Sequence, residues 1–198
     1  MLEPLEKLMQ ALGDLPGVGR RSAERMALAL VRDPSGLLRE LTLALQDAGQ
    51  RVVPCARCGN ITLRSEDPCR LCTDRRRDDK VLCVVEEPAD ILLMERAGAF
   101  RGRYHALMGR LSPMRGEGVQ NIRVEALVER VRKDAVQEVI LALDFDTEGD
   151  ATASYLRDVL GSLGTKVTRP ARGIPTGSGL AYTDAATLAR AVENRQGL

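Results

Sequence analysis

Acidic side chains follow two aliphatic stretches of the sequence, at the points where each stretch ends. One stretch is followed by Glu86 and Glu87, and the other by Asp144 and Asp146. In a parallel sheet, functional groups gather at the carboxyl ends of strands. A glutamate and a D-x-D pair brought together there could hold Mg²⁺ through carboxylates and water, for work on a phosphoryl group. We predict Mg²⁺ ligands at Glu86, Asp144 and Asp146.

The same acids also have a purely structural interpretation. Acidic residues at strand ends cap helices, and Asp146, Thr147 and Glu148 come just before a segment with helical spacing. The N-terminus of a helix favours negative charge. The spacing alone leaves both interpretations open.

Four cysteines form two close pairs, CARC at 55–58 and CRLC at 69–72, with ten residues between them. Two such knuckles close a tetrahedral sulfur site that suits zinc. The surrounding stretch, 54–80, is poor in large aliphatic residues and cannot build a core of its own. We therefore predict structural zinc, rather than a redox pair or two surface turns. The predicted ligands are Cys55, Cys58, Cys69 and Cys72, whereas Cys83 lies in an apolar strand and is expected to be a buried small hydrophobe.

The stretch LPGVGRRSAERMALAL (15–30) matches a helix-hairpin-helix pattern. Glycines in the turn allow positive φ and remove side-chain bulk. Backbone N–H groups at the start of the second helix could then reach a phosphate, in a contact that reads no base sequence. The alternative is a plain α-hairpin with solvated arginines. The predicted DNA contacts are Gly17, Gly19, Arg20, Arg21 and Arg25.

The order of helical and strand-like patterns divides the chain into parts. Helical spacing covers 5–12, 21–31 and 35–50, and the cysteine stretch follows. Strands are expected at 81–85, 104–109, 138–144 and 166–169, with helices at 89–97, 124–131, 152–163 and 184–193. Strands separated by helices predict a mainly parallel sheet with helices on both faces. The predicted fold is α+β in several parts, with boundaries 1–53, 54–80, 81–170 and 171–198.

Composition narrows the class of protein further. The formal net charge is +1, so any nucleic-acid footprint must be local. No apolar run approaches the ~20 residues that would span a bilayer, and the N-terminus lacks a signal-peptide profile, so we expect a cytoplasmic protein. An α-hairpin that exposes Leu5, Leu8 and Leu12 is too small to be stable alone. Pairing with another subunit is therefore expected.

The order of these parts resembles the RecR family of bacterial recombination mediators over nearly the whole chain. The resemblance is carried by LPGVGRRSAERMALAL, the two cysteine pairs, VLCVVEEPADI, YHALMGRLSPMRGEG, EGDATASYL and RGIPTGSGLAYTDAATLARA. It implies a Toprim fold for residues about 81–170 and no enzyme activity. It also implies a ring-like homo-oligomer, a dimer or tetramer, that clamps DNA.

The resemblance further implies partners. RecR-like proteins work with RecO, and in some settings RecF, to load RecA onto SSB-covered gapped or single-stranded DNA. The acidic face is linked to RecO contact, which assigns partner binding to Glu86, Glu87, Asp144 and Asp146. The chain departs from the resembled family at one point. The family often replaces the first Asp of D-x-D, whereas this chain keeps both Asp144 and Asp146, which favours Mg²⁺ binding.

A competing hypothesis is a metal-dependent Toprim nuclease, primase or topoisomerase-like enzyme that uses Glu86, Asp144 and Asp146. Against it, the chain is short and its three tyrosines have ordinary explanations in a helix, a strand and a loop. GIPTGSG (173–179) lacks the lysine of a P-loop. A zinc-dependent redox protein would need an exposed low-pKa thiol. His105, the only histidine, is expected to pack rather than to catalyse.

Overall fold

The computed structural model describes residues 2–98, 100–112, 116, 118–171 and 173–195. It divides into two compact units, Met1–Val53 and Pro54–Leu198. The predicted α+β fold is confirmed, with helices first, then the cysteine cluster, then a parallel sheet. The loop expected after the second strand and the end of the C-terminal segment lie partly outside the described residues.

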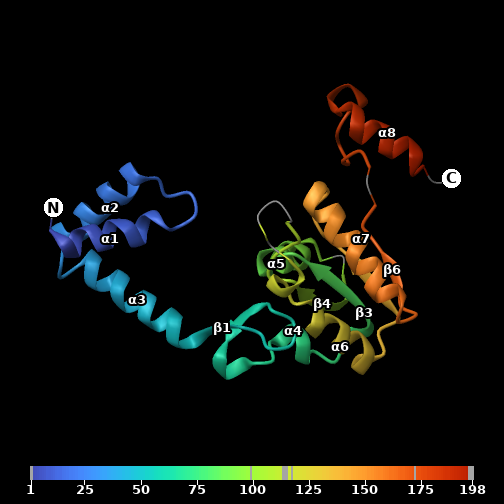
Figure 1. The fold of residues 1–198 in the computed structure, drawn as a ribbon, viewed down its shortest axis with the longest axis horizontal. Helices are drawn as coiled ribbons and strands as arrows, with labels where there is room; N and C mark the ends of the chain where they lie inside the picture. The colour runs from blue at the N-terminus through green and yellow to red at the C-terminus, as the bar shows by residue number, and fades with distance from the viewer. Residues whose placement is uncertain (1, 99, 113–115, 117, 172, 196–198) are drawn as a thin grey trace. The chain divides into compact units, whose positions relative to one another are not determined.

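The first unit is all-helical, with α1 (Glu3–Gly13), α2 (Arg20–Arg32) and α3 (Leu37–Arg51). α1 packs along α2, and α3 leads toward the cysteine stretch (Figure 1). The buried residues of α2 are small or aliphatic: Ala23, Ala27 and Leu30. These alanines allow the helices to approach closely.

The distribution of exposed leucines in this unit differs from the expectation. Leu5, Leu8 and Leu12 are half-buried rather than exposed, because α1 turns them toward its neighbour. Leucines with a larger exposed fraction lie on α3, where Leu43 is 55% and Leu45 is 65% exposed. An unpartnered apolar surface is present, but it lies on a different helix.

The cysteine stretch opens the second unit with little regular structure. A two-stranded sheet joins β1 (Val52–Pro54) and β2 (Ile61–Leu63). The 3-10 turn η1 (Arg64–Glu66) and the single-turn helix α4 (Arg70–Thr73) complete it. The only cluster of buried residues in this stretch consists, among described residues, of the four cysteines.

The centre of the second unit is a four-stranded sheet in the order β4-β3-β5-β6, with every neighbouring pair parallel. The strands are β3 (Asp78–Val85), β4 (Gly102–Ala106), β5 (Glu138–Leu141) and β6 (Lys166–Thr168). The strand expected at 138–144 therefore ends three residues early. The chain needs those residues to turn toward the helix that follows.

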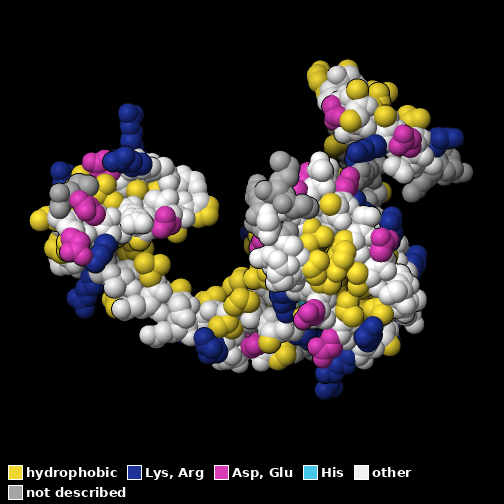
Figure 2. All heavy atoms as spheres, viewed as in Figure 1, with side chains coloured by type: hydrophobic (Ala, Val, Ile, Leu, Met, Phe, Trp, Pro, Cys, Tyr) yellow, Lys and Arg dark blue, Asp and Glu magenta, His cyan; other side chains and the backbone are white. Residues whose placement is uncertain are grey.

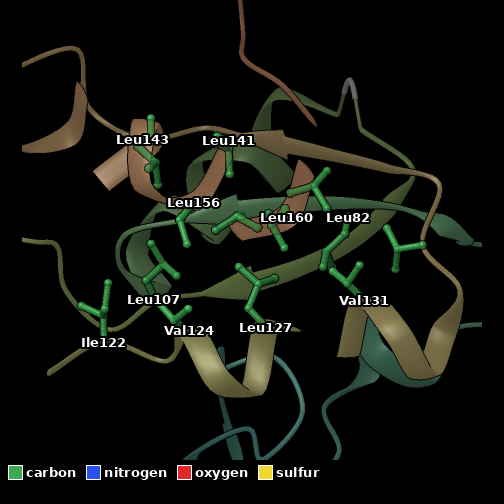
Figure 3. Packing of buried hydrophobic residues seen from close by; sticks show 14 residues of the cluster. Leu82, Leu107, Ile122, Val124, Leu127, Val131, Leu141, Leu143, Leu156 and Leu160 are labelled. Carbon is green, nitrogen blue, oxygen red and sulfur yellow. The ribbon is translucent and has the colours of Figure 1, made fainter. Parts of the chain in front are cut away.

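Helices cover both faces of the sheet, as predicted. α6 (Val124–Asp134) and α7 (Thr147–Gly161) pack on one face, where Leu82 and Val84 of β3 point. Figure 3 shows the leucines and valines of this face turned toward one another between sheet and helices. α5 (Pro88–Ala97) packs on the other face, against the alternate residues of β3, Cys83 and Val85. This alternation is the period of two that a pleated strand requires.

Beyond β6 the chain continues through the 3-10 turn η4 (Leu180–Tyr182) to α8 (Ala185–Glu193). Another 3-10 turn, η3 (Val119–Asn121), precedes α6. None of the helices in the described part of the chain is both long and apolar enough to cross a membrane.

Candidate functional site

The four parallel strands end at one edge of the sheet, and a charged residue comes after each of them. Glu86 follows β3 and Asp144 lies beyond β5, while Arg110 lies beyond β4 and Arg169 directly follows β6. The backbone N–H of Asp144 donates to Oε1 of Glu86 at 3.0 Å. The structure thus brings together the two strand-end acids that the sequence predicted to meet.

Arg110 lies among the carboxylates of this edge. Its Nη1 is 2.7 Å from Oδ2 of Asp146, and its Nε is 2.8 Å from Oε2 of Glu148. The same Nη1 is 3.8 Å from carboxylate oxygens of Glu86 and Asp144. One guanidinium therefore lies within 4 Å of four carboxylates and compensates only part of their negative charge.

Two of these acids differ in their tendency to ionise. Burial raises the pKa of Glu86. The backbone N–H of Gly149 donates to Asp146 Oδ1 at 2.7 Å, and this hydrogen bond lowers the pKa of Asp146. A Cβ at Gly149 would lie 2.2 Å from the carbonyl oxygen of Asp144, so only glycine allows α7 to begin this close to the acidic loop.

Asp146 is the N-cap of α7, so the structural interpretation of its position is correct. Glu87 has a similar place, because it is the N-cap of α5 and its backbone N–H donates to Asp90 at 2.9 Å. Capping does not remove either acid from the surface. Glu87 is exposed and borders a cavity of about 550 Å³ at this edge. The cavity is lined by Glu86, Glu87, Met108, Gly109, Arg110, Asn121, Ile122 and Asp144.

The acidic edge contains no ready set of metal ligands among the residues described. The only group of three or more metal-ligating side chains with ligand atoms within 4.8 Å of one another, in that part of the chain, is the cysteine cluster. Mg²⁺ at Glu86, Asp144 and Asp146 remains a prediction. It would require Arg110 to leave the position between the carboxylates.

The four cysteines converge as predicted. They are at most 4% exposed, and none is in a disulfide. Sγ of Cys58 and Sγ of Cys69 are 3.5 Å apart, close to the ~3.8 Å that zinc–sulfur bonds of ~2.3 Å impose in a tetrahedron. The pKa of Cys72 is raised, first because its thiol donates a hydrogen bond to the Cys55 thiolate, which ionisation would break and replace with two adjacent negative charges. A divalent cation removes this conflict, so the donor set fits zinc.

Hydrogen bonds tie the cysteine cluster to the sheet. The carbonyl of Cys58 accepts from the backbone N–H of Ala106 at 2.7 Å, at the end of β4. Arg57 is 2.8 Å from Asp134 of α6. Arg103 of β4 donates to the carbonyl of Leu71 at 2.6 Å. The cluster is therefore joined to β4 and α6 at several points.

The hairpin of the first unit has the turn that the sequence predicted, with one correction. Gly17 adopts φ +80°, which favours glycine, but Gly19 has φ −79° and is the N-cap of α2. No side chain caps this helix end, and a Cβ at Gly19 would meet nothing within 4 Å. Internal packing therefore does not explain glycine at position 19, whereas close approach from outside would.

The arginines of the hairpin are not used inside the unit. Arg20, Arg21 and Arg25 are exposed. None of their side chains forms an ion pair or hydrogen bond with another residue that the structure describes. Their charge remains available to an external group beside the open N-terminus of α2.

The arginines of the acidic edge were missed by the sequence analysis, which followed only the acids. Arg169 is 2.6 Å from Asp150, donates to the carbonyl of Asp144 and lies 4.7 Å from the ring centre of Phe145. Their place in the sequence, after predicted strands, could have revealed them. Basic as well as acidic residues that follow parallel strands gather at one edge of the sheet. His105 is fully buried, and burial lowers its pKa to about 3, in keeping with packing.

Comparison with known family models supports the parts on either side of the cysteine stretch. Residues 5–49 match the model "RecR, helix-hairpin-helix", residues 80–171 match "Toprim domain" and residues 173–196 match "RecR, C-terminal". A protein named "Recombination protein RecR" from Moorella thermoacetica is 47% identical over 196 residues, which cover 99% of this chain and 98% of that protein. Proteins of the same name are 48% identical in Syntrophotalea carbinolica (97% and 96% coverage) and in Thermobifida fusca (98% and 96%).

Fold and sites together define a Toprim protein that carries a helix-hairpin-helix and a four-cysteine module. The relatives named above, matched over nearly their full length, all carry the name of one group of such proteins. The chain belongs to the RecR family of recombination proteins, and this membership supports a role in DNA recombination and repair.

Proposed function

We propose that the chain is a DNA-binding scaffold of recombinational repair without enzyme activity. It holds gapped, single-stranded or duplex DNA without reading its sequence. It acts with RecO, and in some settings RecF, to load RecA onto SSB-covered strands. It works in the cytoplasm at the nucleoid.

One observation carries the DNA-binding part of the proposal. α2 begins with an uncapped N-terminus at Gly19, and Arg20, Arg21 and Arg25 lie on its first turns without partners among the described residues. Free N–H groups and the helix dipole attract a phosphate, and unpaired guanidinium groups add charge to the same contact. Gly17 and Gly19 leave the backbone open to that approach.

The acidic edge supports the partner part of the proposal. Asp144 has a side chain that is 76% exposed, and its charge is shared with one arginine at 3.8 Å. Together with Glu87 and Asp146 it gives a negative surface beside the cavity that Glu86 lines from a largely buried position, and this surface complements a basic partner such as RecO. Charge reversal at Glu87 and Asp144 should abolish RecO pull-down but leave DNA retention intact.

Two further features support the assembly. Four thiolates fit a zinc ion, which would supply a rigid link within 54–80 and no chemistry of its own, because four ligands leave no site for water. The exposed leucines of α3 favour pairing of the first unit with a second copy, in a ring-like dimer or tetramer.

A single gel experiment tests the proposal against the alternative of a metal-dependent Toprim enzyme. Zinc-loaded protein is incubated with labelled gapped DNA, with and without Mg²⁺ or Mn²⁺, and run on native and denaturing gels. Retarded but intact DNA is expected. Cutting or joining that requires metal and disappears in Asp144→Asn would instead make Glu86, Asp144 and Asp146 an active site.

A further inference from the structure

The exposed face of α2 continues the basic surface well beyond the hairpin turn. Residues 21, 25, 28, 29 and 32 follow the spacing of one helical face, opposite the buried Ala23 and Ala27. They line a groove of about 320 Å³ whose remaining wall is Glu24. Figure 2 shows basic side chains standing out from this unit.

Arg32 lies at the far end of this stripe. The rise of an α-helix puts it about 16 Å along the axis from Arg21. Like those of the hairpin arginines, the side chain of Arg32 forms no ion pair or hydrogen bond with any residue in the described ranges. Lys7, the other candidate for extending the patch, is instead 2.6 Å from Glu3. The stripe thus extends the basic surface in one direction only.

The floor of the groove between the charged ends is apolar. Leu28 is 38% exposed and Ala29 is also exposed. Positive groups separated by a short apolar floor match a phosphodiester strand, in which phosphates alternate with deoxyribose. Three arginines against one glutamate leave the groove positive, so an anionic strand is the complementary occupant.

We propose that the Arg21–Arg32 stripe is a track for the phosphodiester backbone of DNA, with Arg32 holding a second phosphate beyond the one at the hairpin turn. The inference rests on the proposed DNA binding and adds that the DNA strand runs along the axis of α2. The helix C-terminus carries partial negative charge, so the contact there depends on the Arg32 guanidinium.

The test is the salt dependence of DNA affinity for the full-length, zinc-loaded protein. Fluorescence anisotropy with labelled oligothymidylate and with a blunt duplex gives the slope of log affinity against log salt for each variant. Arg32→Ala should make the slope shallower by about 0.7 on the single strand and about 0.9 on the duplex. One contact of this size corresponds to about a sixfold loss of affinity at 0.1 M salt, fading toward 1 M.

Matched variants separate charge from structure. Arg32→Lys keeps the charge and should retain the wild-type slope. Arg39→Ala removes another exposed arginine of the same unit, on α3 and off the stripe, and should also leave the slope unchanged.

Two results would overturn the track. The first is a salt slope that stays at the wild-type value in Arg32→Ala, although the double variant Arg20→Ala with Arg25→Ala still makes the slope shallower. The second is a fall in molar mass by light scattering for Arg32→Ala without a change in slope, which would make the stripe a contact between copies. If the double hairpin variant also keeps its slope, the proposed DNA binding itself fails.

Discussion

The arginines of α2 and those of the acidic edge differ in what they contact. Arg110 and Arg169 lie 2.6–2.7 Å from carboxylate oxygens within their own unit. Arg25 and Arg32 of α2 form no ion pair with an acid that the structure describes. The first pair holds loops together, whereas the guanidinium groups of the second pair remain exposed to solvent.

This difference separates two uses of the same residue type. A paired arginine contributes to the free energy of unfolding, and its loss leaves carboxylates without a counter-charge. An exposed, unpaired arginine contributes little to folding, and its loss is felt only when the binding partner is present. Variants of the two sets should therefore fail in different assays.

The largest effect is expected where paired arginines meet the cysteine cluster. Arg57 ties that cluster to α6 and Arg103 ties it to β4, so loss of a proposed zinc ligand should loosen both anchors. Cys72→Ser should abolish zinc binding, reduce the yield of soluble protein and lower the thermal midpoint by about 10 °C or more. Metal analysis and calorimetry measure this. Cys83→Ala, in the apolar strand, should keep its zinc, and unchanged metal content in Cys72→Ser would contradict the prediction.

The next effect tests the free arginines. Arg20→Ala combined with Arg25→Ala should weaken DNA binding about 10- to 100-fold at 0.1 M salt, because two phosphate contacts are lost. The free energy of unfolding should stay within about 0.5 kcal/mol of the wild type. Anisotropy titration and urea unfolding give the two numbers. A large loss of stability with unaltered DNA affinity would show that these arginines stabilise the fold and do not bind DNA.

The third prediction concerns the arginine held by four acids. Arg110→Ala leaves Asp146 and Glu148 without their closest cation, so the thermal midpoint should fall at pH 7, though less than in Cys72→Ser. The same change should strengthen Mg²⁺ binding, seen as NMR shifts at Asp144 on titration. Arg157→Ala, an exposed arginine of α7 paired with its neighbour Asp158, is the control. Spectra that stay flat to millimolar Mg²⁺ would reject a cation site at this edge.

The smallest effect is the dependence of stability on pH at Asp146. Its folded pKa lies below the ordinary value near 3.8 because Gly149 donates to the ionised carboxylate. The stabilisation is therefore fully present above about pH 4 and is lost as the pH falls through the folded pKa. Asp146→Asn should be less stable than wild type at pH 6, with the gap closing toward pH 2. A difference in stability that stays constant from pH 6 to pH 2 would show that the negative charge of Asp146 does not cause it.

Much of the architecture could be predicted because the relevant signals are local. The cysteine spacing led to a cluster now seen with sulfur atoms 3.5 Å apart, and the alternation of strands with helices led to the parallel sheet. Glu86 and Asp144 meet because parallel strands end together. In each case a rule about nearest neighbours along the chain was enough.

The features that were missed depend on contacts between distant segments. Arg110 reaches Asp146 across 36 positions of sequence, and no periodicity reveals that pairing. The early start of α7 at Thr147 follows from the Asp146 cap and from the close approach of Gly149 to Asp144. The conformation of Gly19 was misjudged because glycine is compatible with either sign of φ, and only the turn decides between them.

The hydrogen bond from Ala106 to Cys58 also affects how readily the protein aggregates. β4 is an outer strand of the sheet, and outer strands with unpaired backbone groups recruit other chains. Here the outward N–H of Ala106 is paired with the cysteine knuckle, and the carbonyl of Tyr104 accepts from Arg130. If the cysteines hold the proposed zinc, opening of the knuckle on metal removal would uncover the Ala106 N–H, and metal-depleted protein should form β-rich aggregates before its sheet has melted.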